Sequence, residues 1–165
     1  RNKGDNPHHL TRLGNCHLKL KDYDKAEECY LAVLAIDPNF GAAHSRLGLI
    51  LGYRQDWIGA INYFTTCVEM DPRSVNARCN LANALCGSGY PKEGLKELDI
   101  GLEIEPQSYP LLRTKIVTLN ILGRTPEAIE LSDKALTYFP GDKQLSTMKE
   151  RLIEGPKPRV IRELK

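Results

Sequence analysis

Asp37-Pro38 recurs along the chain as Asp71-Pro72, Glu105-Pro106 and Phe139-Pro140, and the residue numbers rise by 34 each time. A proline pushes the residue before it out of the helical region, so each dipeptide predicts the end of a helix. The same 34-residue spacing relates four further sets of similar residues: Leu13, Leu47 and Leu81; Gly14, Gly48 and Ala82; Ala26, Ala60, Gly94 and Ala128; and Tyr30, Phe64 and Leu98. Coincident registers of this kind indicate a repeat protein.

Each unit is predicted to contain two helices, because its apolar residues follow a helical spacing on either side of a break. In the first unit, Asp22 is a plausible N-cap for the second helix, which then runs to Asp37-Pro38. The same reasoning marks further helix starts in the later units, at Asp56, Ser74, Pro91, Ser108 and Pro126. Small residues are expected where paired helices approach closely: Gly14, Ala26, Gly48, Ala60 and Ala82.

A 34-residue helix–turn–helix unit with Leu-Gly in its first helix, Ala in its second and a closing Pro resembles the tetratricopeptide repeat. The resemblance implies an all-α fold, a right-handed α-solenoid, with units at residues 7–40, 41–74, 75–108 and 109–142. Residues 1–6 are then an N-terminal flank, and residues 143–153 form an extra helix that covers the last exposed apolar face. Residues 154–165 are interpreted as a basic, Pro-containing linker, or alternatively as a tail that docks onto its own groove or a neighbour's and so mediates self-association.

Two units depart from the family pattern. The third contains Gly87, Gly89, Gly94 and Gly101, and glycine inside a helix is destabilising, so its second helix is expected to be soft. The fourth has Lys115-Ile116 where Leu-Gly belongs, which predicts altered packing or register there.

Composition narrows the functional classes. Lys and Arg number 23 and Asp and Glu number 21, and 23 − 21 gives a net charge of +2. Bulk charge therefore argues against a nucleic-acid partner. The longest apolar run, Leu31–Ile36, is far shorter than the roughly 18 residues of a membrane helix, so no membrane insertion is expected. The sequence does not start with Met, so we expect it to be a piece of something longer.

The cysteines and histidines do not form a recognisable catalytic or metal-binding pattern. Five cysteines without a C-x-x-C pair favour a reducing, cytoplasmic compartment. Cys79 and Cys86 are expected about 10 Å apart on one helix, too far for a disulfide or a shared zinc ion. Cys16, Cys29 and Cys67 are interpreted as small core residues. His17 and His44 stand where the repeat has aromatic packing residues, so they are interpreted as core or half-buried. No metal and no cofactor are predicted.

In the tetratricopeptide-repeat family the first helix of each unit lines a concave face, and such faces bind partner proteins. Helical spacing then predicts the peptide-binding residues: Thr11, Arg12, Asn15 and Lys19; Ser45, Arg46, Leu49 and Tyr53; Asn76, Asn80 and Asn83; and Arg113, Val117 and Asn120. His8, Cys79 and Cys86 share this predicted face. The alternative is that these are solvated surface residues without a ligand.

Two kinds of side chain give this face its predicted chemistry. Asparagines both donate and accept hydrogen bonds, which suits them to hold a peptide backbone irrespective of its sequence. Arg12 and Arg46 occupy equivalent positions and supply bidentate donors for an acidic group, with Arg113 as a third candidate.

Family members that bind chaperone tails hold the terminal carboxylate with two Lys, two Asn and one Arg. The corresponding places are Thr11, Asn15, Arg46, Asn76 and Asn80, and only Asn15 matches, so heat-shock chaperone C-termini are not expected as partners. The sequence therefore predicts a non-catalytic protein–protein interaction scaffold that binds an extended or helical peptide. The alternative is the substrate- or partner-recruiting segment of a larger enzyme, of glycosyltransferase or sulfotransferase type.

Overall fold

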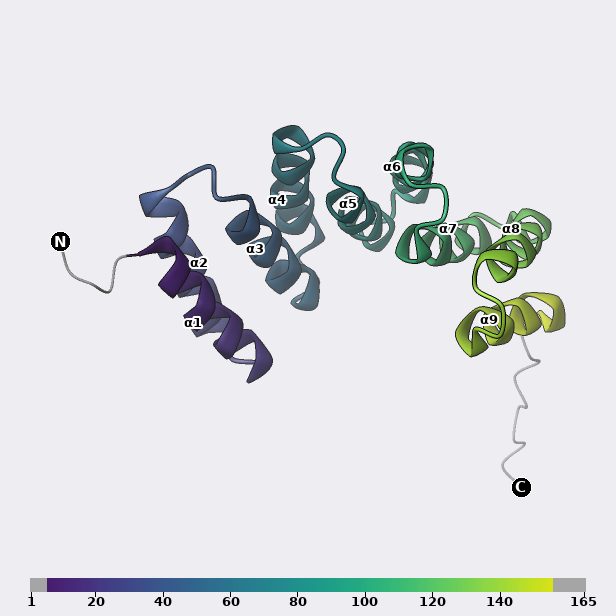
Figure 1. The fold of residues 1–165 in the computed structure, drawn as a ribbon, viewed down its shortest axis with the longest axis horizontal. Coiled ribbons are helices and arrows are strands. Elements are labelled where there is room, and N and C mark those ends of the chain that lie inside the picture. The colour runs from purple at the N-terminus through teal and green to yellow at the C-terminus, as the bar shows by residue number, and fades with distance from the viewer. Residues whose placement is uncertain (1–5, 156–165) are drawn as a thin grey trace, which may run out of the picture.

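The computed structural model describes residues 6–155, and over that range every regular element is a helix. The predicted all-α solenoid is thereby confirmed (Figure 1). The helices are α1 (Pro7–Lys19), α2 (Tyr23–Ile36), α3 (Gly41–Tyr53), α4 (Trp57–Met70), α5 (Val75–Gly87), α6 (Pro91–Ile104), α7 (Tyr109–Ile121), α8 (Thr125–Tyr138) and α9 (Lys143–Glu154).

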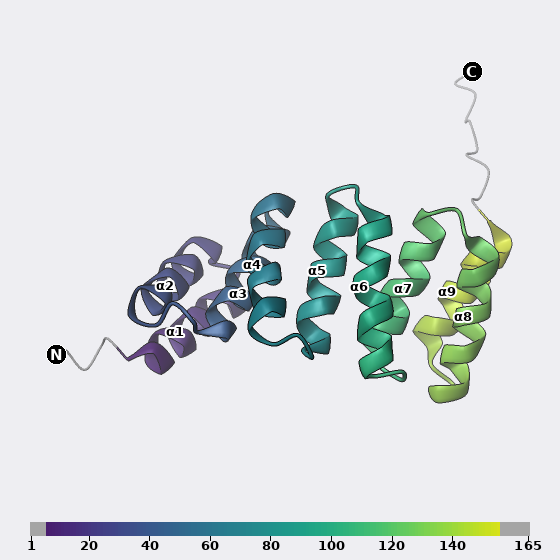
Figure 2. The same ribbon diagram turned by 90° about the horizontal axis from the view of Figure 1, so that it is seen from above.

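The helices form two layers that run the length of the molecule. Each odd-numbered helix up to α7 packs against the even-numbered helix that follows it, and each even-numbered helix packs against the next odd one. In Figure 1, α4 and α6 lie above α3, α5 and α7. Figure 2 shows the units side by side from α1 at one end to α8 and α9 at the other. We call the exposed surface of α1, α3, α5, α7 and α9 the odd-helix face.

Several helices begin where the sequence predicts, because a side-chain oxygen accepts a hydrogen bond from a first-turn backbone N–H. Asp22 accepts from the N–H of Lys25, and Asp56 accepts from that of Gly59 at 3.0 Å. Ser74 caps α5 in the same way. Ser108 also precedes its helix, but its hydroxyl makes no capping bond and its side chain is buried, so this part of the prediction is wrong.

Close approach within the first two helix pairs depends on glycine. A Cβ atom at Gly14 would lie 2.8 Å from Cζ of Tyr30, and one at Gly48 would lie 2.6 Å from Cε1 of Phe64. Both distances are shorter than van der Waals contact, so these positions accept no larger residue without displacing an aromatic ring. The prediction that small residues permit this pairing is confirmed.

The glycine-rich α6 spans 14 residues, the same length as α2, α4 and α8. Its glycines are packing positions: a Cβ at Gly94 would lie 2.9 Å from the carbonyl oxygen of Ala82, and one at Gly101 would lie 2.7 Å from Cδ1 of Leu111. The glycines therefore allow α5 and α7 to pack closely on α6.

The fourth unit keeps the register of the others, since α7 spans 13 residues as α1, α3 and α5 do. Ile116 is buried, and Nζ of Lys115 lies 2.6 Å from Oδ1 of Asp99 on α6. The same pairing recurs one repeat later, where Lys149 on α9 lies 2.5 Å from Asp133 on α8. An ion pair thus occupies the position that leucine holds in the second and third units.

The outer side of α1 is exposed, whereas the equivalent side of each later odd-numbered helix is covered by the preceding unit. Leu13 is 49% exposed, but Leu47 and Leu81 are 1% and 7% exposed. Cys16 is exposed for the same reason, so its prediction as a core residue is wrong, whereas Cys29 and Cys67 are buried as predicted. Burial at these positions is supplied by the unit before.

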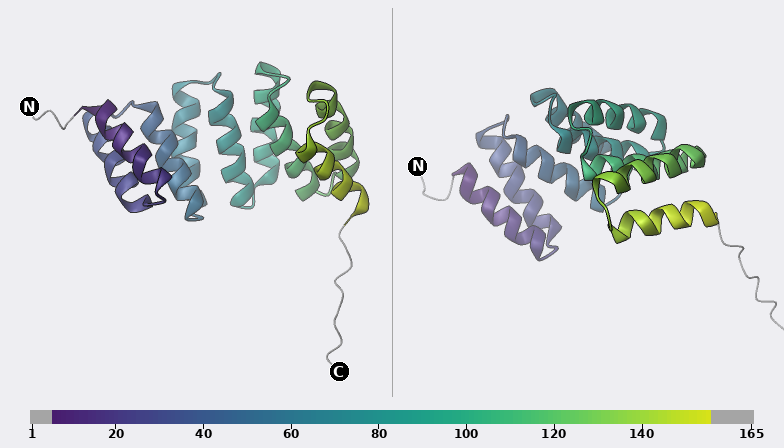
Figure 3. Two further views of the ribbon diagram at one scale, coloured as in Figure 1. Left: turned by 60° about the horizontal axis from the view of Figure 1, so that its bottom comes forward. Right: turned by 45° about the vertical axis from the view of Figure 1, so that its right-hand side comes forward.

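At the other end, α9 lies beside α8 (Figure 3). Leu145 is fully buried in that contact. Ser146 and Glu150 occupy the places that Leu112 and Ile116 hold one repeat earlier, and Glu150 is exposed. The side of α9 away from the stack is therefore more polar than its counterpart on α7.

Candidate peptide-binding face

All the predicted peptide-binding residues lie on the odd-numbered helices α1, α3, α5 and α7, and none of them is buried. Their side chains therefore belong to the odd-helix face or its margins. The structure brings only some of them together, in hollows between α3 and α5 and between α7 and α9.

The first hollow lies between α3 and α5, with α4 beneath it. It has a volume of about 220 Å³ and is lined by Gly48, Leu49, Gly52, Tyr53, Trp57, Phe64, Asn80, Asn83 and Ala84. Four of the predicted residues meet here, namely Leu49, Tyr53, Asn80 and Asn83. Trp57 and Phe64 were not predicted to line the face, because both belong to the second helix of their unit.

Polar groups in this hollow come from α5. The side-chain N–H of Asn83 lies 3.8 Å from Sγ of Cys79, a weak interaction. Among residues 6–155, the amide of Asn80 makes no side-chain hydrogen bond, so its donor and acceptor groups remain open to a ligand.

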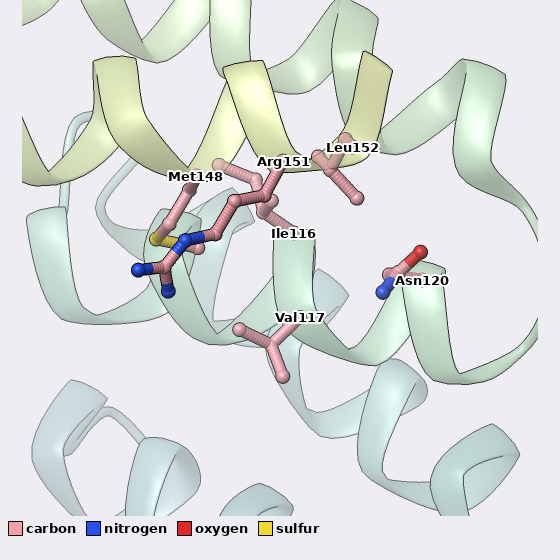
Figure 4. Close-up of a pocket in the computed structure, with 6 residues that line it drawn as sticks. All are labelled: Ile116, Val117, Asn120, Met148, Arg151 and Leu152. Atoms are coloured by element: carbon pink, nitrogen blue, oxygen red, sulfur yellow. The ribbon is translucent and has the colours of Figure 1, made fainter. Parts of the chain in front are cut away.

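The second hollow lies between α7 and α9, has a volume of about 170 Å³, and is lined by Ile116, Val117, Asn120, Met148, Arg151 and Leu152 (Figure 4). Val117 and Asn120 were predicted, whereas the α9 residues were not, because residues 143–153 were interpreted only as a covering helix. The repeat register contains the missing signal: Arg151 stands one full repeat after Val117, so α9 presents the same positions as a first helix of a unit.

A basic hollow adjoins the second one and shares Met148 and Arg151 with it. Its lining consists of Arg113, Lys143, Gln144, Thr147, Met148 and Arg151. Within the described part of the chain, none of its three cations forms an ion pair with a carboxylate. Other cations of the molecule are paired, for example Arg78 with Glu97 at 2.5 Å.

Several predicted residues are engaged within the protein or line none of these hollows. The hydroxyl of Thr11 donates to the carbonyl oxygen of Pro7 at 2.7 Å, and Oδ1 of Asn15 accepts from the hydroxyl of Tyr30 at 2.9 Å. Burial raises the pKa of Tyr30 to about 12, so this donor stays protonated at neutral pH. The others are at the surface but outside the hollows: Arg12, Lys19, Ser45, Arg46 and Asn76.

The cysteines of α5 face inward. Cys79 is buried, its Sγ lies 3.6 Å from Oγ1 of Thr114, and burial raises the pKa of its thiol. Cys79 is therefore not a groove residue, contrary to its predicted place. His17 and His44 are half-buried as predicted, and the ring of His44 lies 5.7 Å from that of Tyr63.

Over residues 6–155 no cluster of three or more His, Cys, Asp or Glu side chains is arranged to hold a metal ion. Over the same range no helix has the length and apolarity needed to cross a membrane.

Comparison with known proteins gives one family and several relatives. The family described as "Tetratricopeptide repeat" matches residues 9–40. The chain is 24% identical over 149 residues to Hsp70-Hsp90 organizing protein 2 of Arabidopsis thaliana, which covers 90% of this chain and 25% of the relative. It is 35% identical over 78 residues to the uncharacterized protein y4yS of Sinorhizobium fredii, covering 47% of this chain and 43% of that protein. The chain thus spans less than half the length of either relative.

Among solved structures, a thermophilic tetratricopeptide-repeat protein from Thermus thermophilus superimposes with a TM-score of 0.75 at 20% identity, covering 90% of this chain and 82% of that one. Residues 9–40 therefore match the tetratricopeptide repeat, and residues 6–155 have the helical fold of a tetratricopeptide-repeat protein.

Proposed function

We propose that this chain is a non-catalytic scaffold that binds an extended or helical peptide segment of a partner protein along its odd-helix face. The observation that carries the proposal is the pair of hollows at α3–α5 and α7–α9. Each combines an apolar wall with at least one side-chain amide. Such a series of shallow sites along one face suits a peptide that contacts several units in turn.

The size of the hollows favours side chains of a peptide over a small molecule. At about 220 and 170 Å³ they are smaller than the about 300–1,000 Å³ that drug-sized ligands occupy. Each has room for one apolar side chain, and burying a Leu or Phe side chain contributes roughly 1.5–3 kcal/mol. A peptide with two apolar anchors would use both.

The amides support binding that does not depend on the peptide's sequence. Asn80 keeps both its donor and its acceptor groups open, and Asn120 accepts from the Thr125 hydroxyl at 3.3 Å, which leaves its NH2 group to donate. These groups can bond a peptide carbonyl or N–H whatever side chain the peptide carries.

The chaperone partners named in the Arabidopsis relative are not carried over to this chain. Of the five clamp places, only Asn15 has the residue that the clamp has at that same place. The side-chain oxygen of Asn15 already accepts a hydrogen bond from the Tyr30 hydroxyl. We propose instead a different protein ligand.

The five cysteines are free thiols, which supports a reducing compartment.

Selection of peptides from a random display library on the intact chain tests this proposal, followed by calorimetry on the selected sequences. We expect micromolar binding, about −8 kcal/mol. Tyr53→Ala and Asn83→Ala should each weaken binding about tenfold, since each removes a contact worth roughly 1.4 kcal/mol.

The matched controls are Ile100→Ala and Lys96→Ala, which remove an exposed apolar and an exposed charged side chain from α6 in the other layer. The proposal fails if no peptide is selected, or if the α6 variants weaken binding as much as the α3 and α5 variants do.

A further inference from the structure

We propose that α7 and α9 form a subsite that binds a peptide carboxylate next to an apolar side chain. This inference rests on the proposed function, because it specifies the chemistry of the peptide at the C-terminal end of the odd-helix face. The contributing side chains are Arg113, Lys143 and Arg151 for the carboxylate, and Val117 and Met148 for the apolar group.

The first observation is the concentration of unpaired positive charge. Arg113 comes from α7, Lys143 begins α9 and Arg151 follows two turns later, and all three line one hollow. No Asp or Glu belongs to that lining. Like charges held close together repel one another, so a bound anion between them is stabilised by all three. Two guanidinium groups also offer the bidentate geometry that carboxylates prefer.

The acidic residues nearby are accounted for. Asp142 caps α9 by accepting from the N–H of Leu145 at 2.8 Å, and it also accepts from the hydroxyl of Tyr109 at 3.3 Å. Glu150 and Glu154 line an adjoining hollow that shares Thr147 and Arg151 with the basic one, but Arg113 and Lys143 are not part of its lining. Within residues 6–155, no carboxylate lines the basic hollow or forms an ion pair with its three cations.

The second observation is that the basic hollow and the apolar hollow share two residues. Figure 4 shows Arg151 and Met148 projecting from α9 toward α7, with Val117 opposite them. Methionine adapts its shape to different apolar side chains. A ligand that fills both hollows must therefore carry its carboxylate and its apolar side chain within one or two residues of each other, since residues two apart in an extended chain lie roughly 7 Å apart.

Two kinds of peptide provide this chemistry. In one, the last residue is apolar and its terminal carboxylate is the anion. In the other, an internal Asp or Glu stands beside an apolar residue. Both present the same pair of groups to α7 and α9, so the experiment must separate them.

Titrations followed by the arginine Nε–Hε signals of the ¹⁵N-labelled chain test the inference. Four Gly-Ser peptides serve as probes: one ending in Leu with a free carboxylate, its C-terminal amide, an amidated peptide with internal Asp-Leu, and the same peptide with Asn-Leu. We expect the Arg113 and Arg151 signals to shift with at least one carboxylate peptide. Its neutral counterpart should bind at least about tenfold more weakly, and the carboxylate peptide should lose affinity as salt rises from about 0.05 to 0.3 M.

Arg113→Gln and Arg151→Gln should each weaken that carboxylate peptide about tenfold. The matched control is Lys92→Gln/Lys96→Gln, which removes two exposed cations from α6 and should leave binding unchanged. Circular dichroism of each variant serves to check that it remains folded.

The inference is overturned if no probe shifts these signals at about 1 mM, if neutral and charged probes bind equally, or if the arginine variants bind as the parent does. Failure here with selected peptides still dependent on Tyr53 and Asn83 would refute the subsite and leave the proposed function standing. If only the library selection fails, the proposed function is refuted. The carboxylate titrations then still decide whether the subsite on α7 and α9 binds a carboxylate.

Discussion

Lys115 on α7 forms an ion pair with Asp99 on α6, with 2.6 Å between Nζ and Oδ1, at the position where the second and third units have Leu47 and Leu81. The pair is only partly shielded, because the Asp99 side chain is 49% exposed. Ion pairs of this kind contribute little to stability, whereas leucines at the same position are almost fully buried.

Replacing this pair by Asp99→Leu/Lys115→Leu should therefore keep or increase stability, by up to about 1 kcal/mol. The single change Lys115→Leu should be less favourable, because it leaves Asp99 without its partner. Urea unfolding of the three proteins measures both effects. A double variant less stable than the parent by more than about 1 kcal/mol would show that the ion pair is specifically required.

Two glycines on α3 give opposite predictions for the same substitution. Gly48→Ala should destabilise the chain by about 1–3 kcal/mol, because the new Cβ would lie 2.6 Å from the Phe64 ring. Gly52→Ala should stabilise it by about 0.5–1 kcal/mol, since a Cβ there meets only Trp57 at 3.8 Å and alanine favours the helix. Chemical unfolding monitored by circular dichroism compares them, and equal effects at the two sites would contradict the packing described for α3 and α4.

Asp22 predicts a pH dependence of stability. Hydrogen bonding from the Lys25 side chain lowers the pKa of the Asp22 carboxyl below its ordinary value of 3.8. A carboxyl whose pKa is lower in the folded state stabilises the fold above its unfolded pKa, and that contribution is lost as the pH falls below about 3.8.

Asp22→Asn retains a capping oxygen but cannot titrate. The difference in melting temperature between parent and variant should therefore shrink as the pH is lowered from neutral through this range. A difference that stays constant with pH would show that Asp22 acts only as a cap.

The thiols should react at different rates in the folded protein. Cys16 is exposed, whereas Cys29, Cys67 and Cys79 are buried and burial raises the pKa of each. We expect Cys16 to react first with an aromatic disulfide reagent and Cys86 to react more slowly. The buried thiols should react only when the protein unfolds.

Mass spectrometry of the labelled peptides identifies the order. Cys16→Ser should remove the fast phase and leave the rest unchanged. If the fast phase persists in that variant, another thiol is more accessible than its surroundings in the structure indicate.

The sequence was sufficient to predict the fold because the information is periodic and local. The closing proline recurs in every unit, and Gly48 and Ala60 occupy the same places in the second unit as Gly14 and Ala26 in the first. Burial at α1 was predicted less well. Leu13 and Cys16 have the spacing of buried residues. Burial at their positions depends on contact with a preceding helix pair, however, and the spacing along one helix does not show whether that contact exists.

The candidate binding face was predicted as a set of positions rather than as a site. Helical spacing correctly placed Leu49, Tyr53, Asn80 and Asn83 on α3 and α5, yet it gave equal weight to Asn15 and Cys79. Their engagement by Tyr30 and Thr114 depends on packing between helices, which spacing along one helix does not reveal. Arg151 was overlooked because α9 was assigned a covering role only.

The two ends of the stack differ in a way that gives the molecule a direction. The exposed side of α1 presents Leu13 and Cys16, positions that accept a neighbour throughout the array, whereas the far side of α9 presents Ser146 and Glu150. A helix that packed over Leu13 would bury an apolar side chain, which is favourable, whereas one that packed over Glu150 would have to desolvate a carboxylate. The two surfaces therefore differ in the free energy of covering them.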